Sequence, residues 1–219
     1  MLKTYIFKKC FITIFALFFS TAVCFANIFP VNVNDIPQKT MGVYQTDEII
    51  TVYEKPDNTS TIVYNRTVDY AALVGVKQDS FFAVLIPKKN LGYAYATNIS
   101  DDEEWIEIIY NKDKNLKGWV RKNDDFQFLP WGNFYNLYGR KYGLIKLKNQ
   151  QIELNGIFSQ PDESGQVLGT LSRPKFIHLT SLEGNWMLIS VLDLSGQTTT
   201  GYLQWRTNDG KFLLFPDIK

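Results

Sequence analysis

Four short motifs occur twice in this chain, in the same order, and this repeat constrains the fold more than any other feature. Each copy has a Pro-Asp turn, an apolar pair, a strand opening with Trp, and a strand opening with Gly and an aromatic residue. The first copy reads Pro56-Asp57, Ile62-Val63, Trp105-Ile106-Glu107-Ile108 and Gly118-Trp119-Val120, and the second reads Pro161-Asp162, Val167-Leu168, Trp186-Met187-Leu188-Ile189 and Gly201-Tyr202-Leu203. The recurrence predicts two copies of one small β module.

The residues around these motifs also favour β structure. Aromatic residues make up 15% of the chain, and such residues pack well on a pleated surface. Short apolar runs alternate with turn residues at near-regular spacing, which is typical of small barrels. No stretch after residue 26 shows sustained helical periodicity. We therefore expect an all-β protein made of two tandem small barrels.

The spacing of the motifs sets the expected domain bounds. The Pro-to-Trp distance is longer in the first copy, which predicts an insertion at about residues 76–100 of a first domain spanning 41–130. The insertion is either a binding loop, as loops on a rigid scaffold often are, or an extra hairpin that packs on the barrel. Residues 131–142 form a connector too aromatic for a flexible linker, so we expect it to be buried. The second domain spans 143–219.

The N-terminus resembles a secretion signal. Three lysines precede an apolar run over residues 11–25, which is shorter than the roughly 20 residues of a membrane span. We expect a signal peptide over residues 1–26, cleaved after Ala26, and a loose leader over 27–40. The protein is then secreted or periplasmic, with no membrane segment after cleavage. An uncleaved anchor helix and a lipid attached to Cys24 remain alternatives.

The residue inventory argues against several kinds of chemistry. Both cysteines, Cys10 and Cys24, lie in the expected signal peptide, and His178 is the one histidine. Thiol catalysis needs a cysteine beside a base, and zinc sites need three or four ligands. We therefore expect no cofactor, no metal and no enzymatic activity. His178 is expected on a barrel wall or rim, and the acidic run over residues 101–104 on a solvated loop. The net charge of +1 gives no reason to expect a nucleic-acid partner.

The doubled motifs resemble the bacterial SH3-like family, SH3b. In that family an early strand leads into a turn with Pro or Gly, followed by an apolar pair, a Trp-x-x-Ile/Val strand and a Gly-Trp-Val closing strand. The resemblance covers about two-thirds of the chain after residue 26 and implies two tandem SH3-like barrels. It also implies a binding or adaptor protein that recognises a cell-envelope component, either peptidoglycan peptide or a protein partner. A carboxylate-dependent cell-wall hydrolase and a structural adaptor or inhibitor are the alternatives, and the oligomeric state is open.

In a barrel of this type, exposed rings beside the early turn and the closing strand can form a groove. Aromatic side chains provide large contact area at low entropic cost. Trp105 and Trp186 are expected in the core, because they open the strand that the family buries. The candidate ligand-binding residues are Tyr53, Tyr64 and Trp119 in the first copy and Phe158, Tyr202 and Trp205 in the second.

Overall fold

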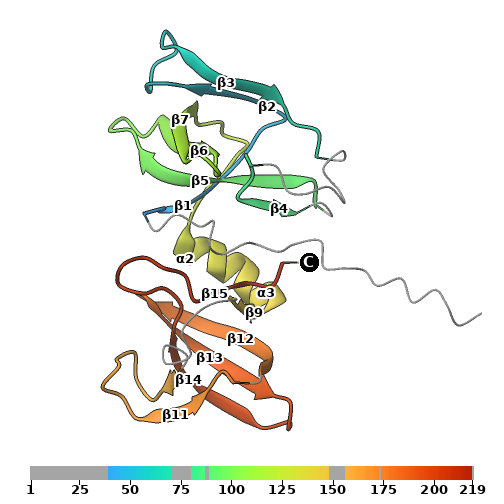
Figure 1. The fold of residues 1–219 in the computed structure, drawn as a ribbon, viewed down its shortest axis with the longest axis vertical. Coiled ribbons are helices and arrows are strands. Elements are labelled where there is room, and N and C mark those ends of the chain that lie inside the picture. Colours follow the sequence, from blue (N-terminus) through green and yellow to red (C-terminus); the bar gives the residue numbers. More distant parts are fainter. Residues whose placement is uncertain (1–38, 71–79, 87–88, 148–155, 173, 219) are drawn as a thin grey trace, which may run out of the picture.

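The computed structural model describes residues 39–70, 80–86, 89–147, 156–172 and 174–218. The expected signal peptide and residues 27–38 of the expected leader lie outside the described residues. The described chain is mostly β-strand with one short helical segment, which confirms the all-β prediction. One sheet lies at each end of the molecule, and the helical segment lies between them (Figure 1).

The first sheet is antiparallel and contains eight strands. They are β1 (Gly42–Gln45), β2 (Ile49–Tyr53), β3 (Ile62–Thr67), β4 (Val84–Ile86), β5 (Leu91–Ile99), β6 (Trp105–Asn111), β7 (Leu116–Arg121) and β8 (Phe128–Pro130). The strand order is β3-β2-β7-β6-β5-β1-β8, and β4 pairs with the remaining length of β5.

The second sheet has five antiparallel strands. They are β10 (Gly156–Phe158), β11 (Val167–Thr170), β12 (Pro174–Glu183), β13 (Trp186–Asp193) and β14 (Thr198–Gln204). Their order is β11-β10-β14-β13-β12. A separate two-stranded ribbon pairs β9 (Leu144–Lys146) with β15 (Leu214–Pro216).

Each of the two sheets contains five strands in the same order. The order β3-β2-β7-β6-β5 corresponds to β11-β10-β14-β13-β12, and the registers agree as well. Trp119 lies opposite Glu107 on β6, just as Tyr202 lies opposite Leu188 on β13. A bulge interrupts β2 after Val52, and another interrupts β10 at the matching place. The doubled motifs therefore fall on corresponding strands.

The Pro-Asp turns also match in their hydrogen bonds. The Oδ1 atom of Asp57 accepts a bond of 2.8 Å from the backbone N–H of Thr59, and Oδ1 of Asp162 accepts one of 2.8 Å from Ser164. This is the local bonding that makes Asp a favoured turn residue. The same turn chemistry thus closes the first hairpin of both copies.

The extra residues of the first copy lie earlier than the expected 76–100. Strand β5 pairs with β6 across a bulge, as β12 pairs with β13, so residues 91–99 belong to the shared core of the sheet. The additional length falls between β3 and β5, of which residues 71–79 and 87–88 lie outside the described residues. Within the described part, Phe81 and Phe82 are buried and β4 extends the sheet, as expected for an extra hairpin.

The expectation of small barrels needs correction, because neither sheet closes on itself. The first sheet ends at β3 and β8, and the second ends at β11 and β12. A sheet can bury its apolar face either by curling up or by accepting another layer. Here Tyr135, Leu214 and Phe215 cover the inner face of the second sheet in one continuous core. The second sheet therefore remains open, while the inner face of the first sheet packs against Phe81, Phe82 and Leu85 in a core of its own.

Part of the covering layer is the aromatic connector over residues 131–142, which was expected to be buried. It comprises α2 (Trp131–Phe134), the π-helical η3 (Tyr135–Gly139) and α3 (Arg140–Tyr142). The sequence predicted no helix in this segment, and that prediction was wrong. Trp131, Phe134, Tyr135 and Tyr138 follow the i, i+3, i+4, i+7 spacing of an amphipathic helix, but the segment was too short for that spacing to stand out. All four side chains are buried, which confirms the expected burial.

The helical segment joins the two sheets. The Tyr138 hydroxyl is 2.7 Å from that of Tyr93 on β5, and the Tyr135 hydroxyl donates to the carbonyl of Leu214 on β15 at 2.5 Å. Burial raises the pKa of all three tyrosines above the usual value. They therefore stay neutral and keep the hydroxyl protons that these bonds require. One core cluster runs from the first sheet through the helix to the second sheet.

Candidate functional site

A row of side chains crosses each sheet on the side away from its inner core, which contains Ile106 in the first sheet and Met187 in the second. In the first sheet Tyr53 on β2 pairs with Ile62 on β3 and with Trp119 on β7, and Trp119 pairs with Glu107 on β6. Strands in a sheet are about 4.8 Å apart, so this row spans roughly 14 Å. We call Ile62, Tyr53, Trp119 and Glu107 the first row.

The second sheet repeats this arrangement. Phe158 on β10 pairs with Val167 on β11 and with Tyr202 on β14, and Tyr202 pairs with Leu188 on β13. We call Val167, Phe158, Tyr202 and Leu188 the second row. Each row is apolar at its exposed end, where Ile62 keeps 51% and Val167 keeps 57% of its surface exposed.

In each row the ring on β2 or β10 contacts a tryptophan that lies two strands away, on β6 or β13. The Tyr53 and Trp105 rings lie edge to face with centroids 5.5 Å apart, and Phe158 and Trp186 do the same at 5.6 Å. Such aromatic pairs contribute about 0.5–1.5 kcal/mol beyond the area they bury. The same T-shaped pair thus orients one ring in each row.

The structure changes the expected role of the two tryptophans. Trp105 is 4% exposed, so its predicted burial is confirmed, whereas Trp186 is only half-buried. Because side chains alternate along a strand, Ile106 and Met187 point into the inner cores and the tryptophans before them point outward. Trp105 and Trp186 therefore pack against Tyr53 and Phe158, the rings of the two rows, and not against the inner cores.

Tyr64 does not join the first row. It lies opposite Val52, and its ring stacks on Phe81 at 5.5 Å with an interplanar angle of 3°. It is also 5.5 Å from the ring of Tyr110 and packs against the inner core of the first sheet. The structure thus places Tyr64 on the opposite face from Tyr53 and Trp119.

Trp205 is a core residue, so its expected place in the groove was wrong. It is 4% exposed, its ring lies 4.5 Å from that of Tyr135, and its Nε1–H donates to the carbonyl of Gly184 at 3.0 Å. Tyr202 faces outward, and a position three residues further along a strand faces the other way. Tyr53, Trp119, Phe158 and Tyr202 remain as the surface rings brought together by the structure.

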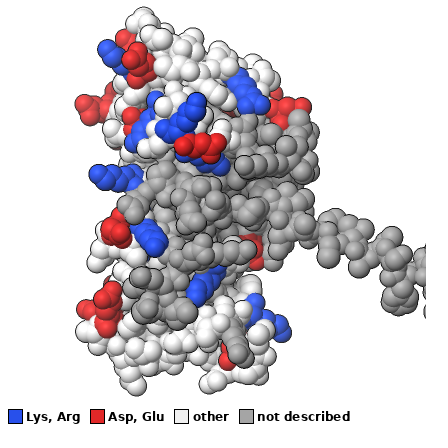
Figure 2. All heavy atoms as spheres, in the orientation of Figure 1, with Lys and Arg blue, Asp and Glu red and all other residues white. Residues whose placement is uncertain are grey.

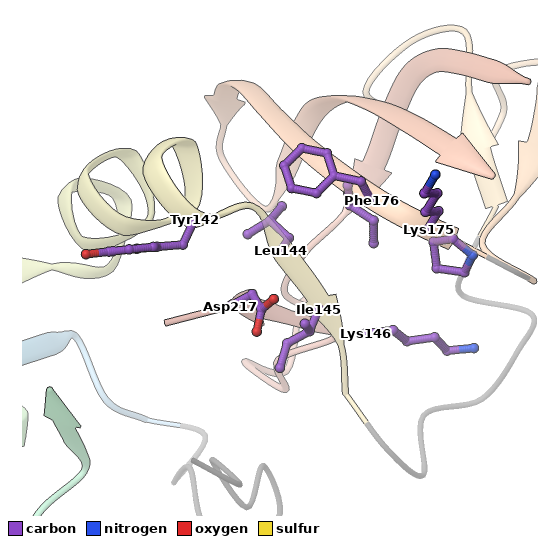
Figure 3. Close-up of a pocket in the computed structure, with 9 residues that line it drawn as sticks. Tyr142, Leu144, Ile145, Lys146, Lys175, Phe176 and Asp217 are labelled. Carbon is purple, nitrogen blue, oxygen red and sulfur yellow. The ribbon is translucent and has the colours of Figure 1, made fainter. Parts of the chain in front are cut away.

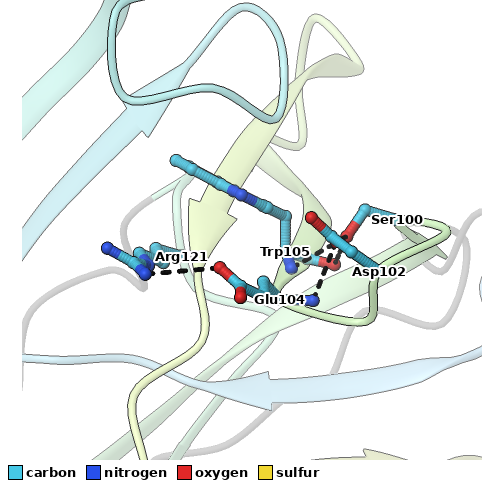
Figure 4. A network of polar contacts seen from close by, with 5 residues as sticks. All are labelled: Ser100, Asp102, Glu104, Trp105 and Arg121. Carbon is cyan, nitrogen blue, oxygen red and sulfur yellow. Dashed lines mark hydrogen bonds and ion pairs between the residues drawn. The ribbon is translucent and has the colours of Figure 1, made fainter.

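The acidic run beside the first row is a hydrogen-bonded turn (Figure 4). The hydroxyl of Ser100 donates to Asp102 at 2.5 Å, the backbone N–H of Glu104 donates to the same carboxylate at 3.0 Å, and Glu104 pairs with Arg121 at 3.3 Å. The Ser100 hydrogen bond, followed by that of Glu104, lowers the pKa of Asp102. Residues 101–104 are exposed, as expected for a solvated loop.

The first row also contains a charged residue, Glu107, which has polar partners on the neighbouring strands. Glu107 accepts a hydrogen bond of 2.5 Å from the Thr97 hydroxyl and lies 3.9 Å from the ammonium of Lys117. Acidic and basic side chains are interspersed over the visible face of the molecule (Figure 2). No group of three or more metal-ligating side chains occurs in the described ranges.

A cavity of about 260 Å³ lies at the edge of the second sheet (Figure 3). Phe176 and Leu144 form apolar parts of its lining, and Lys146, Lys175 and Asp217 bring charged groups to it. His178 is exposed, and its ring stacks on that of Phe176 at 6.4 Å. This places His178 on the outward face of β12, in agreement with the expected wall or rim position.

In comparisons with known proteins, the sequence matches no protein-family model and no curated protein. Among the described helices, none is long and apolar enough to cross a membrane. The SH3b resemblance and the site therefore rest on the motifs and the geometry presented above.

Proposed function

We propose that this is a secreted or periplasmic, non-catalytic binding protein built from two SH3b-like modules. It recognises a cell-envelope component, either peptidoglycan peptide or a protein partner, through the two outward rows. The observation that carries the proposal is the repeat of one row, supported by one T-shaped ring pair, at the same register in both sheets.

A repeated surface row is better explained by binding than by packing. The inner face of each sheet already belongs to a hydrophobic core, so the outward rings are not needed to build one. Tyr53, Trp119, Phe158 and Tyr202 are all half-buried, which leaves ring surface for a ligand. Half-exposed Tyr and Trp are the residues that most often contribute binding energy at interfaces.

Retention on envelope material tests this function. We expect the protein without residues 1–26 to be retained on purified sacculi or on a protein from an envelope extract. Trp119→Ala and Tyr202→Ala should each lower retention by about tenfold, which corresponds to about 1.4 kcal/mol of binding free energy. Leu194→Ala is the control, because Leu194 is 70% exposed in the turn after β13 and outside both rows.

The same assay separates binding from hydrolysis. A binding protein leaves the sacculi intact, so no soluble muropeptides should appear during the incubation. Release of muropeptides that stops when one Asp or Glu is changed would identify the carboxylate-dependent hydrolase instead. Equal retention of all three variants and the unchanged protein would show that neither row is the binding surface.

A structural adaptor is a second candidate, favoured by the core that both sheets share. The carbonyl of Thr40 accepts hydrogen bonds from Trp131 at 3.0 Å and from Arg206 at 3.1 Å, which ties the start of β1 to the helical segment and to the end of the second sheet. These contacts fix the first row and the second row relative to each other. An adaptor would bind two partners at once, one through each row.

A further inference from the structure

The outward face of the second sheet combines aromatic rings with neutral polar side chains. Alternation places Met187, Ile189, Val191 and Leu203 in the core, so their neighbours on β13 and β14 face outward. The outward residues are Phe158, Val167, Phe176, His178, Ser181, Glu183, Trp186, Leu188, Ser190, Leu192, Thr198, Thr200, Tyr202 and Gln204.

This face differs from its counterpart on the first sheet. Among the described residues just named, Glu183 is the one that is Asp, Glu, Lys or Arg, and it lies at the hairpin end opposite Trp186. On the first sheet, outward positions of β6 and β7 hold Glu107, Lys117 and Arg121. Where the first row ends in the carboxylate of Glu107, the second row ends in Leu188.

Gln204 is the second observation that points to a ligand. It is 6% exposed, and within the described part of the chain its side-chain amide has no hydrogen-bond partner. A buried amide without a partner costs about 1–3 kcal/mol, so such groups in native proteins call for an explanation. At the matching position on β7, Arg121 pairs with Glu104 at 3.3 Å. Gln204 lies opposite Trp186 and on the same side of β14 as Tyr202.

We propose that the outward face of the second sheet binds an uncharged glycan chain of N-acetylated hexose units. The rings of Phe158, Trp186 and Tyr202 contact the C–H faces of the sugars, and the amide of Gln204 hydrogen-bonds an acetamido or hydroxyl group. This inference rests on the proposed function, since it names the ligand class of one of the two rows.

Charge decides between the possible occupants. An anionic ligand is recognised best by Arg and Lys, and neither occurs at the outward positions named above. A cationic ligand is recognised by carboxylates, and the one carboxylate at those positions, Glu183, lies at the hairpin end of the face. A neutral sugar has an apolar C–H face and a polar rim, which match rings flanked by Ser, Thr and Gln. Ser190 and Thr200 already share a hydrogen bond of 2.9 Å, so their hydroxyls are held in place beside Tyr202.

Calorimetric titration with the tetramer of N-acetylglucosamine tests the proposal, using the protein without residues 1–26. We expect a Kd of about 1 mM or tighter. Because the ligand is neutral, the Kd should change little between low and high salt. Tyr202→Ala should weaken binding by about tenfold, whereas Leu194→Ala, at a 70% exposed position outside both rows, should leave the Kd within about twofold.

Gln204→Leu provides a readout that is independent of folding defects. Removing a buried amide that has no partner should leave the thermal midpoint unchanged or raise it, while affinity for the tetramer falls severalfold. A lowered midpoint with unchanged affinity would show that the amide is structural and would overturn its assignment to the ligand.

Other outcomes also contradict the proposal. Absence of tetramer binding, equal losses in Tyr202→Ala and Leu194→Ala, or strong salt dependence would each overturn it. Dimerisation abolished by Tyr202→Ala would place a second copy of the chain on this face instead. If retention on sacculi persists without tetramer binding, the glycan assignment fails and the proposed function stands. If the protein is retained on no envelope component, the proposed function fails, whether or not the protein binds the tetramer.

Discussion

At the scale of single residues, burial separates two tryptophans that occupy the same place in the repeat. Trp105 and Trp186 open corresponding strands and make matching T-shaped contacts with Tyr53 and Phe158. Trp105 is nevertheless almost fully buried, whereas Trp186 is only half-buried. Stability contributed by a ring follows the area it removes from water. We therefore expect the two equivalent tryptophans to contribute different amounts to the free energy of unfolding.

Alanine substitution should show this difference. Trp105→Ala should cost roughly 3–5 kcal/mol, the usual range for removing a buried Phe or Trp. Trp186→Ala should cost clearly less, because water already reaches its ring. Urea unfolding of both variants measures the two free energies of unfolding. Equal losses would mean that the exposed part of Trp186 contributes as much as a buried ring, which would contradict the burial argument.

At the scale of elements, the helical segment begins and ends at residues suited to those places. Pro130 precedes α2, and Gly143 ends α3 with φ of 78° and ψ of −171°. This region of the backbone map is essentially limited to glycine. A Cβ atom at Gly143 would also lie 2.7 Å from the Phe176 ring on β12 and 3.1 Å from the carbonyl oxygen of Ile177. The chain must therefore leave the helix at Gly143 to reach β9.

Two glycines in this segment should respond to alanine in opposite ways. Gly143→Ala should destabilise the protein by about 1–3 kcal/mol because of backbone strain, in addition to the contact with Phe176. Gly132→Ala is the matched control, since Gly132 lies in α2 and nothing is within 4 Å of its added Cβ atom. It should be neutral or stabilise by up to about 1 kcal/mol, because alanine favours helix. Thermal unfolding of the two variants checks both signs, and a neutral Gly143→Ala would contradict the strain.

At the scale of the whole molecule, the two sheets form one folding unit. Phe134 is fully buried, with its ring 6.1 Å from that of Tyr93 in the first sheet and 5.6 Å from that of Phe215 on β15. Trp131 is likewise 4.8 Å from Phe212 and 6.2 Å from Tyr95. The rings of the helical segment thus pack in one cluster with residues of both sheets, beside the separate inner core of the first sheet.

We expect a single unfolding transition for the whole chain after residue 26. Phe134→Ala should lower the stability of both halves together, by roughly 3–5 kcal/mol. Leu137→Ala, at a 48% exposed position of the same segment, should cost less than about 0.5 kcal/mol. Hydrogen exchange of β6 and β13 amides reports on each sheet separately. Loss of protection in β13 with β6 unaffected would show that the sheets unfold independently.

The sequence by itself determined the β class, the repeat and four of the surface rings. These are local properties, because alternation and turn residues act over a few positions, as the paired Asp57 and Asp162 turns show. Trp119 and Tyr202 were found because they lie inside the repeated motifs, and Tyr53 and Phe158 because each lies three residues before the proline of its copy.

Only the tertiary structure decided how the sheets bury their inner faces. Trp205 is buried against Tyr135 and Tyr64 against Phe81, through contacts with segments far away in the sequence. The helical segment forms because two open sheets each offer its rings an apolar surface, and a segment this short is not a stable helix alone. The helix covers the inner face of the second sheet, whereas the inner face of the first sheet has a core of its own and the helix packs on its Tyr93 and Tyr95. The rings of both rows lie outside these inner cores and remain half-buried.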